Sequence, residues 1–197
     1  MTFRLGLTGS IGMGKSTTAQ MFVDAGCALW DADAAVHRLY DVGGAAVAPM
    51  QSAFPDAVQN GAVSRAALKA MISDNPTVLS RIEQIVHPLV AADRLAFSAG
   101  TETDIAVFDI PLLFENATEA TLDAVVCVTA PMEAQRQRVM DRGTMSKAQF
   151  DAIRAKQMPD AEKRARADYV IETDTLEHAR DQVDAVIKDI RENRIHA

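Results

Sequence analysis

The sequence lacks the features of membrane, secreted and disulfide-stabilised proteins. No apolar run approaches the ~20 residues that a membrane-spanning helix needs, so we expect no membrane partner. Residues 1–8 lead directly into a glycine-rich segment, without the apolar stretch and cleavage site of a signal peptide. The two cysteines, Cys27 and Cys127, each lie in a short apolar run, where a reduced cysteine packs as a small hydrophobe. These absences predict a soluble, cytoplasmic protein.

An excess of positive charge is also missing. The 197 residues carry a formal net charge of −7, which argues against a nucleic-acid partner. The charge is uneven, because the segment from Arg136 to Arg166 holds nine basic and four acidic residues, a net +5 that leaves −12 for the rest. A solvated helical face would explain this segment, and so would a basic lid that closes over phosphates.

Short apolar runs separated by helical patterns predict the fold class. The strand-like runs are residues 3–8, 27–31, 105–110, 123–129 and 168–173. From Gly43 to Gly100 the pattern is helical with no convincing strand, and Pro88 is expected to kink or break a helix there. We therefore predict an α/β protein with a parallel sheet covered by helices, a helical insertion, and ligands at the carboxyl ends of the strands.

A phosphate-binding loop follows the first strand. Residues 9–16 match the pattern G-x-x-x-x-G-K-[ST] between a strand and an amphipathic helix, which indicates the P-loop NTPase type of sheet. Glycines let successive backbone N–H groups point at phosphate oxygens, and the helix dipole favours the same anion. Lys15 is expected to reach the β- and γ-phosphates of ATP, Ser16 to ligate Mg²⁺, and Thr17 to support the α-phosphate. The residues predicted to bind ATP here are Gly9, Gly12, Met13, Gly14, Lys15, Ser16 and Thr17.

Acidic residues follow two other strands. Asp31 and Asp33 come after the second strand, beside the phosphate loop in a sheet of this class. One carboxylate can hold Mg²⁺ while the other accepts the proton of an attacking hydroxyl, although such a pair can also cap a helix. Asp109 ends the third strand, where P-loop proteins commonly place an acid near the metal. The apolar run that follows it, which includes Leu113, is either a buried loop or a wall of the acceptor pocket.

Basic side chains complete the candidate site. Arg138 and Arg142 are spaced i, i+4 and share a helix face, from which they can clamp the oxygens of a phosphoryl group in transfer. His87 precedes Pro88 in an apolar helix, where it is either a satisfied core residue or a contact to substrate. Together with the phosphate loop, these residue types are typical of ATP-dependent phosphoryl transfer.

These motifs resemble the dephospho-coenzyme A kinase family over nearly the whole chain. The matching segments are LGLTGSIGMGKST, DAD at 31–33 with His37, IVHP, FDIPLLFE, Gln135 with Arg138 and Arg142, and KQMPDAEKRARADYVI. The resemblance implies transfer of the ATP γ-phosphate, with Mg²⁺, to the ribose 3′-hydroxyl of dephospho-coenzyme A, the last step of coenzyme A biosynthesis. The expected partners are small molecules, and we expect a monomer or a weak homo-oligomer.

The resemblance also implies roles and domains. Asp33 would be the catalytic base, with Lys15 and Arg142 as further catalytic residues and Asp31 and Ser16 at the metal. The residues expected on the acceptor side are Asp33, His87, Leu113 and Glu115. A five-stranded parallel sheet in residues 1–34, 101–135 and 167–197 would bind the nucleotide, residues 35–100 the coenzyme side, and residues 136–166 would form the lid.

Two other interpretations stay open. A kinase of another small metabolite, such as a nucleoside monophosphate, shikimate or gluconate kinase, would share the loop, the acid pair and the lid, and would differ only in the acceptor pocket. A nucleotide-dependent switch would use hydrolysis to change conformation. The N-K-x-D motif of GTPase switches and the L-S-G-G-Q-like signature of transporter ATPases are both absent from the sequence.

Overall fold

The computed structural model of the chain describes residues 2–195 and divides into two compact units. The first unit contains the described residues up to Leu29 and those from Thr101 onward, and the second spans Trp30–Gly100. Each unit has a hydrophobic core of its own. Within residues 2–195, none of the helices combines the length and the apolar character that crossing a membrane requires.

The central sheet has five strands in the order β2-β5-β1-β6-β7. The pairs β1–β5, β1–β6 and β6–β7 are parallel, as the sequence predicts. Every residue of β5 and β6 is buried, because helices cover both faces, and this explains why these strands are continuous apolar runs. The strands are β1 (Phe3–Thr8), β2 (Ala28–Asp31), β5 (Ile105–Asp109), β6 (Ala124–Thr129) and β7 (Tyr169–Glu172).

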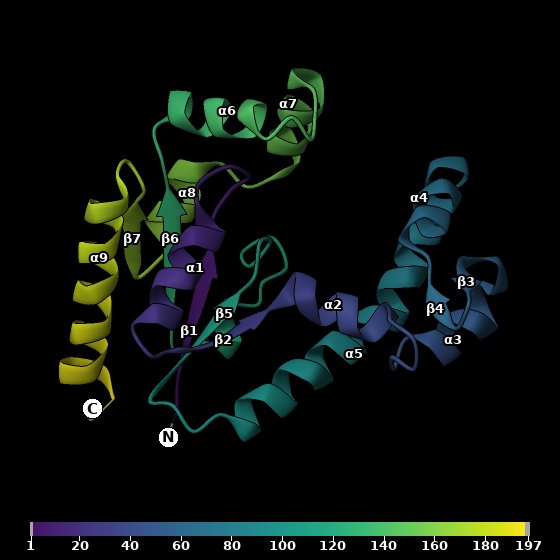
Figure 1. Cartoon of the computed structure of the whole chain (residues 1–197), viewed down its shortest axis with the longest axis horizontal. Helices are drawn as coiled ribbons and strands as arrows, with labels where there is room; N and C mark the ends of the chain where they lie inside the picture. The colour runs from purple at the N-terminus through teal and green to yellow at the C-terminus, as the bar shows by residue number, and fades with distance from the viewer. Residues whose placement is uncertain (1, 196–197) are drawn as a thin grey trace. The chain divides into compact units, whose positions relative to one another are not determined.

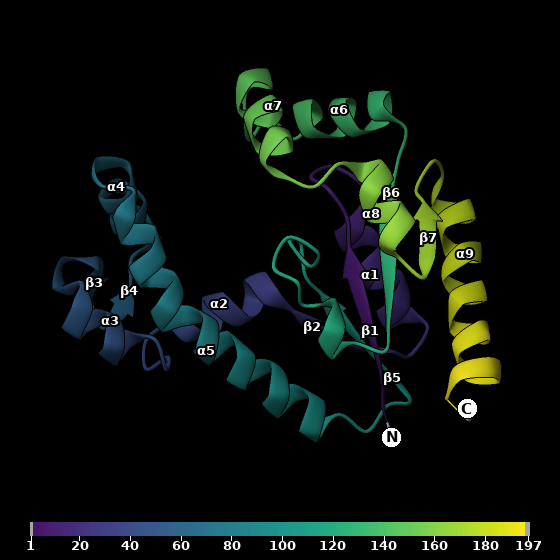
Figure 2. The same cartoon turned by 180° about the vertical axis from the view of Figure 1, so that it is seen from behind.

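Helices of the first unit lie on both faces of this sheet (Figures 1 and 2). α1 and α9 contact each other on one face, where α9 also contacts β7, and α8 contacts β6 on the other face. The helices are α1 (Lys15–Asp24), α6 (Met132–Asp141), α7 (Lys147–Lys156), α8 (Asp160–Arg166) and α9 (Leu176–Asp189), which continues as a π-helical turn, Ile190–Arg194. A 3₁₀ turn, η2 (Glu119–Thr121), precedes β6.

Both cysteines are buried free thiols in the first unit, as the sequence predicts. Burial raises the pKa of Cys27 to about 11 and that of Cys127 to about 12. Because the thiolate is the reactive form, both side chains act as small hydrophobes at neutral pH.

The second unit is mostly helical and packs around its longest helix. Trp30 Nε1 of β2 and Arg38 Nη2 of α2 both donate to Asp93 Oδ1 of α5, each at 2.7 Å, which ties β2 and the last turn of α2 to α5. The elements are α2 (Ala32–Tyr40), α3 (Val47–Ala53), η1 (Pro55–Ala57), β3 (Val58–Gln59), β4 (Ala62–Val63), α4 (Arg65–Asp74) and α5 (Thr77–Gly100).

The hairpin of β3 and β4 corrects the expectation of no strand between Gly43 and Gly100. Val58 pairs with Val63 and Gln59 with Ala62 in antiparallel register. The two-residue turn is Asn60-Gly61, with φ of +52° and +78°, the conformation that matches the twist of a tight hairpin. Strands of two residues are too short to show an alternating pattern, so only the Asn-Gly pair could have revealed them.

Pro88 also behaves differently from the expectation of a break. α5 runs through it from Thr77 to Gly100. Proline removes one hydrogen bond of the helix, at a cost of roughly 3 kcal/mol. Contacts of α5 with α2, α3 and α4, which bury Ile82 and Val86, offset this cost.

Candidate active site

The phosphate loop lies between β1 and α1, where the sequence predicts it. Gly12 and Gly14 have φ of +78° and +91°, in the left-handed region that glycine adopts readily. Gly14 is the N-cap of α1, so the helix begins at Lys15. The first N–H groups of a helix have no partner inside it, and together with the helix dipole they stabilise an anion at this end.

Other parts of the first unit pack against this loop too closely for side chains. A Cβ at Gly12 would lie 2.6 Å from Val139 Cγ2 and 2.9 Å from Gln135 O, both in α6. A Cβ at Gly9 would lie 2.7 Å from Val128 O of β6. Glycine is therefore required by space at both positions, and by backbone conformation at Gly12. The shape of the loop is set by β6 and α6.

Lys15 forms an ion pair with Asp109, the last residue of β5. The parallel register of β1 and β5 brings the carboxyl ends of these strands together. The side chain of Asp109 is only 2% exposed, and a buried carboxylate is costly unless a cation balances it. The predicted acid at this strand end thus holds the ammonium group of Lys15, for which phosphate oxygens would compete.

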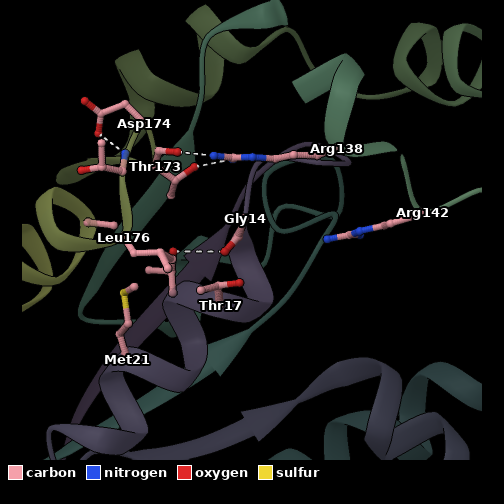
Figure 3. A pocket seen from close by; sticks show the side chains of 11 residues that line it. Gly14, Thr17, Met21, Arg138, Arg142, Thr173, Asp174 and Leu176 are labelled. Atoms are coloured by element: carbon pink, nitrogen blue, oxygen red, sulfur yellow. Dashed lines mark hydrogen bonds between the residues drawn. The ribbon is translucent and has the colours of Figure 1, made fainter. Parts of the chain in front are cut away.

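A cavity of about 190 Å³ opens beside the start of α1 (Figure 3). Thr173 forms one wall, and its Oγ1 lies 2.8 Å from Met13 O and 2.8 Å from Arg138 Nη1. Since the hydroxyl accepts from Arg138, its proton can be donated to Met13 O. The lining residues are Gly14, Thr17, Thr18, Met21, Arg138, Arg142, Thr173, Asp174, Thr175, Leu176 and Ala179.

The two predicted arginines both line this cavity, but they are used differently. Arg138 donates to Oγ1 and to the carbonyl oxygen of Thr173. The guanidinium group of Arg142 makes no hydrogen bond or ion pair within residues 2–195, and Figure 3 shows it pointing toward the side of Gly14 and Thr17. Arg138 therefore shapes the cavity, while Arg142 is available to a ligand.

The acid pair lies in the second unit, at the start of α2. Asp31 is the N-cap, and its Oδ1 accepts from Ala34 N at 2.7 Å, which is the capping role that the sequence also allowed. This bond uses one carboxylate oxygen. Asp33 is exposed in the first turn of α2. His87 is exposed on α5, so it is not a core histidine.

The PLLFE loop (residues 111–115) buries its two central apolar side chains, Leu113 and Phe114. Leu113 is 0% and Phe114 4% exposed, whereas Leu112 is 40% exposed. A Cβ at Gly6 would lie 2.8 Å from Leu113 Cδ1, so the missing side chain of Gly6 makes room for Leu113 against β1. The side chain of Leu113 is thus buried against β1, and its expected place on the acceptor side stays a prediction.

Glu115, expected on the acceptor side, is engaged with the protein itself. Its Oε1 lies 2.8 Å from Lys163 Nζ and accepts from Met158 N at 2.9 Å. Sequence reasoning missed Lys163, which it counted among the basic residues of the lid. It also missed Thr173, although this residue directly follows β7, at the carboxyl end of the sheet, where ligands bind.

The sequence is similar to classified proteins over nearly all of its length. A model of the family described as Dephospho-CoA kinase matches residues 3–178. The dephospho-CoA kinase of Ruegeria pomeroyi is 68% identical over 197 residues, which is 100% of both chains. That of Cereibacter sphaeroides is 60% identical over 190 residues, 96% of each chain.

Solved structures agree with this similarity. TT1252 from Thermus thermophilus has a TM-score of 0.84 at 32% identity, over 96% of this chain and 98% of that chain. Dephospho-CoA kinase from Campylobacter jejuni has a TM-score of 0.70 at 24% identity, with the same coverage. Shikimate kinase from Acinetobacter baumannii has a TM-score of 0.56 at 17% identity, over 98% of this chain and 96% of that chain. The last two likenesses concern the fold alone, and they agree with the predicted α/β fold, a parallel sheet covered by helices.

Proposed function

The chain belongs to the dephospho-CoA kinase family and is a kinase, and from this premise we propose how its residues act. The reaction is transfer of the ATP γ-phosphate to the ribose 3′-hydroxyl of dephospho-coenzyme A, which yields coenzyme A and ADP. The observation that supports these roles best is the phosphate loop itself, with Lys15 near its end. The guanidinium group of Arg142, which has no partner within residues 2–195, lines the cavity beside this loop. Each is a donor suited to phosphate oxygens.

We propose that the phosphate loop and the cavity beside it hold ATP. Backbone N–H groups between Gly9 and Thr17 would receive the phosphates, and Lys15 would move from Asp109 to the β- and γ-phosphates. The turn after β7, which begins at Thr173, would border the adenine ring of ATP in the cavity. Loss of the Lys15 ion pair would then be compensated by phosphate charge.

The donor set is compatible with Mg²⁺, which prefers oxygen ligands and keeps several of its waters. Ser16 offers a hydroxyl in the first turn of α1, and the Oδ2 atom of Asp31 is not used by the helix cap. These are the residues that we propose as ligands. When bound, the ion would neutralise charge on the β- and γ-phosphate oxygens.

Asp33 is the proposed base. As the acceptor oxygen forms its bond to the γ-phosphorus, the hydroxyl proton passes to the carboxylate of Asp33 while the bond to ADP breaks. Arg142 would stabilise the equatorial oxygens, because its planar guanidinium group can donate two parallel hydrogen bonds.

The acceptor assignment predicts a strong preference among hydroxyl compounds. Dephospho-coenzyme A should be phosphorylated with a kcat/KM at least ~100-fold above adenosine, AMP or shikimate, a difference of roughly 3 kcal/mol in transition-state binding. ADP release with each acceptor measures this directly. A better rate with any competitor would contradict the assignment, and fast ATP hydrolysis without acceptor would favour a nucleotide-dependent switch.

A further inference from the structure

Lys163 is a charged residue whose side chain is fully buried. It lies on α8 at 0% exposure, with Nζ 2.8 Å from Glu115 Oε1 and 3.4 Å from Pro111 O. A buried ammonium group is costly unless a carboxylate and further acceptors surround it. Both partners belong to the PLLFE loop, so Lys163 fastens this loop to α8.

Glu115 connects the same loop to the backbone that precedes α8. Burial raises the pKa of Glu115, but the hydrogen bonds from Lys163 and from Met158 N lower it more, so that the pKa lies below its ordinary value. The carboxylate is therefore charged at neutral pH. Its Oε1 is shared between Lys163 Nζ and Met158 N, which are both held by one atom of the PLLFE loop.

A second ion pair strengthens the attachment of α8 to this region. Arg166 Nη2 lies 2.6 Å from Glu119 Oε1, in the turn that follows the PLLFE loop. The guanidinium group of Arg166 also lies 4.9 Å from the ring centroid of Phe114. This pair is more exposed than that of Lys163, so it is expected to contribute less.

The residue before Met158 reaches the phosphate loop. Gln157 Oε1 accepts from Ile11 N at 3.1 Å, and Gln135 Nε2 donates to Ile11 O at 2.7 Å. Gln157 and Met158, which we call the bridging pair, thus bond to two different loops through consecutive residues. One bond goes to the phosphate loop and the other to the PLLFE loop.

We propose that the bridging pair couples nucleotide binding to acceptor binding, and that Lys163 and Glu115 are positioning residues that hold it in place. A phosphate that orders the backbone around Ile11 would also fix the side chain of Gln157, which bonds to Ile11 N. Gln157 is followed by Met158, whose N–H would then hold the carboxylate of Glu115 in place. The PLLFE loop would then be ordered before the acceptor arrives, so the loop would lose less conformational entropy when the acceptor binds. This inference rests on the proposed function and adds to it that the PLLFE loop borders the acceptor, on the side of Leu112, which is 40% exposed.

The test is the coupling factor between the two ligands. Binding of dephospho-coenzyme A is measured by calorimetry without and with saturating β,γ-methylene ATP and Mg²⁺. In the unmodified protein we expect the nucleotide to tighten acceptor binding by roughly 5–150-fold, the usual range of coupling between sites. The variant Lys163→Met with Glu115→Met should reduce this factor to about 2-fold or less. It replaces a buried ion pair by apolar side chains, an exchange that proteins often tolerate in stability.

Two further variants separate coupling from folding. Gln157→Met removes the hydrogen bond from Ile11 N and should reduce the coupling factor to the same extent as the double variant. It tests the inference independently of whether the double variant folds. Glu119→Gln weakens the neighbouring ion pair without touching the bridging pair and should keep it. Full coupling in Gln157→Met, or none in the unmodified protein, would overturn the inference while leaving the function intact. No binding of dephospho-coenzyme A under any condition would overturn both.

Discussion

Replacing Asp33 by asparagine is expected to lower kcat by about 10²–10⁴-fold, the usual contribution of general-base catalysis. Asparagine has nearly the same size but cannot take up the hydroxyl proton. Asp33 is exposed in the first turn of α2, so the fold should not change. ATP affinity should stay within about threefold of the unmodified value, since the loss concerns a step after binding. Steady-state ADP release and equilibrium binding of ATP measure the two quantities.

Asp31→Asn is the matched control for this experiment. Asp31 caps α2 through Oδ1, and asparagine caps helices about as well as aspartate, so α2 should be kept. We expect a raised Mg²⁺ requirement rather than loss of the proton acceptor. If Asp33→Asn turned over at nearly the unmodified rate while Asp31→Asn did not, the role of the base would pass to Asp31.

Arg142→Ala is expected to lower kcat by about 10²–10³-fold, the usual effect of removing one donor to transition-state charge. The guanidinium group of Arg142 has no ion pair within residues 2–195, so its removal should not weaken the fold. Arg142→Lys keeps the charge but loses the bidentate geometry, and should still cost ~10-fold or more in kcat. Both effects should exceed the change in ATP affinity.

Arg138→Lys is the contrasting variant, because Arg138 is already bonded to Thr173. Loss of the guanidinium group should loosen the cavity wall and raise the KM for ATP more than it lowers kcat. Equal kinetic effects at Arg138 and Arg142 would show that the division between a wall residue and a catalytic residue is wrong.

The strands and the phosphate loop could be predicted because their signals are local. β5 is apolar over residues 105–108 and β6 over residues 124–128, and the loop from Gly9 to Ser16 has a fixed spacing. The β3–β4 hairpin was missed because each strand has only two residues. Of the kink or break expected at Pro88, the break does not occur, because packing of α5, which a sequence pattern does not measure, outweighs the lost hydrogen bond.

The partners of the site residues could not be predicted, since they are far apart in the chain. Lys15 and Asp109 are 94 residues apart, and Arg138 and Thr173 are 35 apart. From the sequence alone, the basic residues between Arg136 and Arg166 could be described only as an excess of positive charge. In the structure, several of them face carboxylates: the pairs are Lys147–Asp151, Lys163–Glu115, Arg164–Asp160 and Arg166–Glu119. Charge counting alone cannot separate a paired lysine from an available arginine.

The fate of the γ-phosphoryl group tests the central claim most directly. A single turnover with γ-³²P-labelled ATP, dephospho-coenzyme A and Mg²⁺ should place the label on the acceptor, in stoichiometric balance with ADP. A 3′-nucleotidase should then release all of the label from the product. Label that appears as inorganic phosphate without the acceptor, or that resists the 3′-nucleotidase, would contradict transfer to the ribose 3′-hydroxyl.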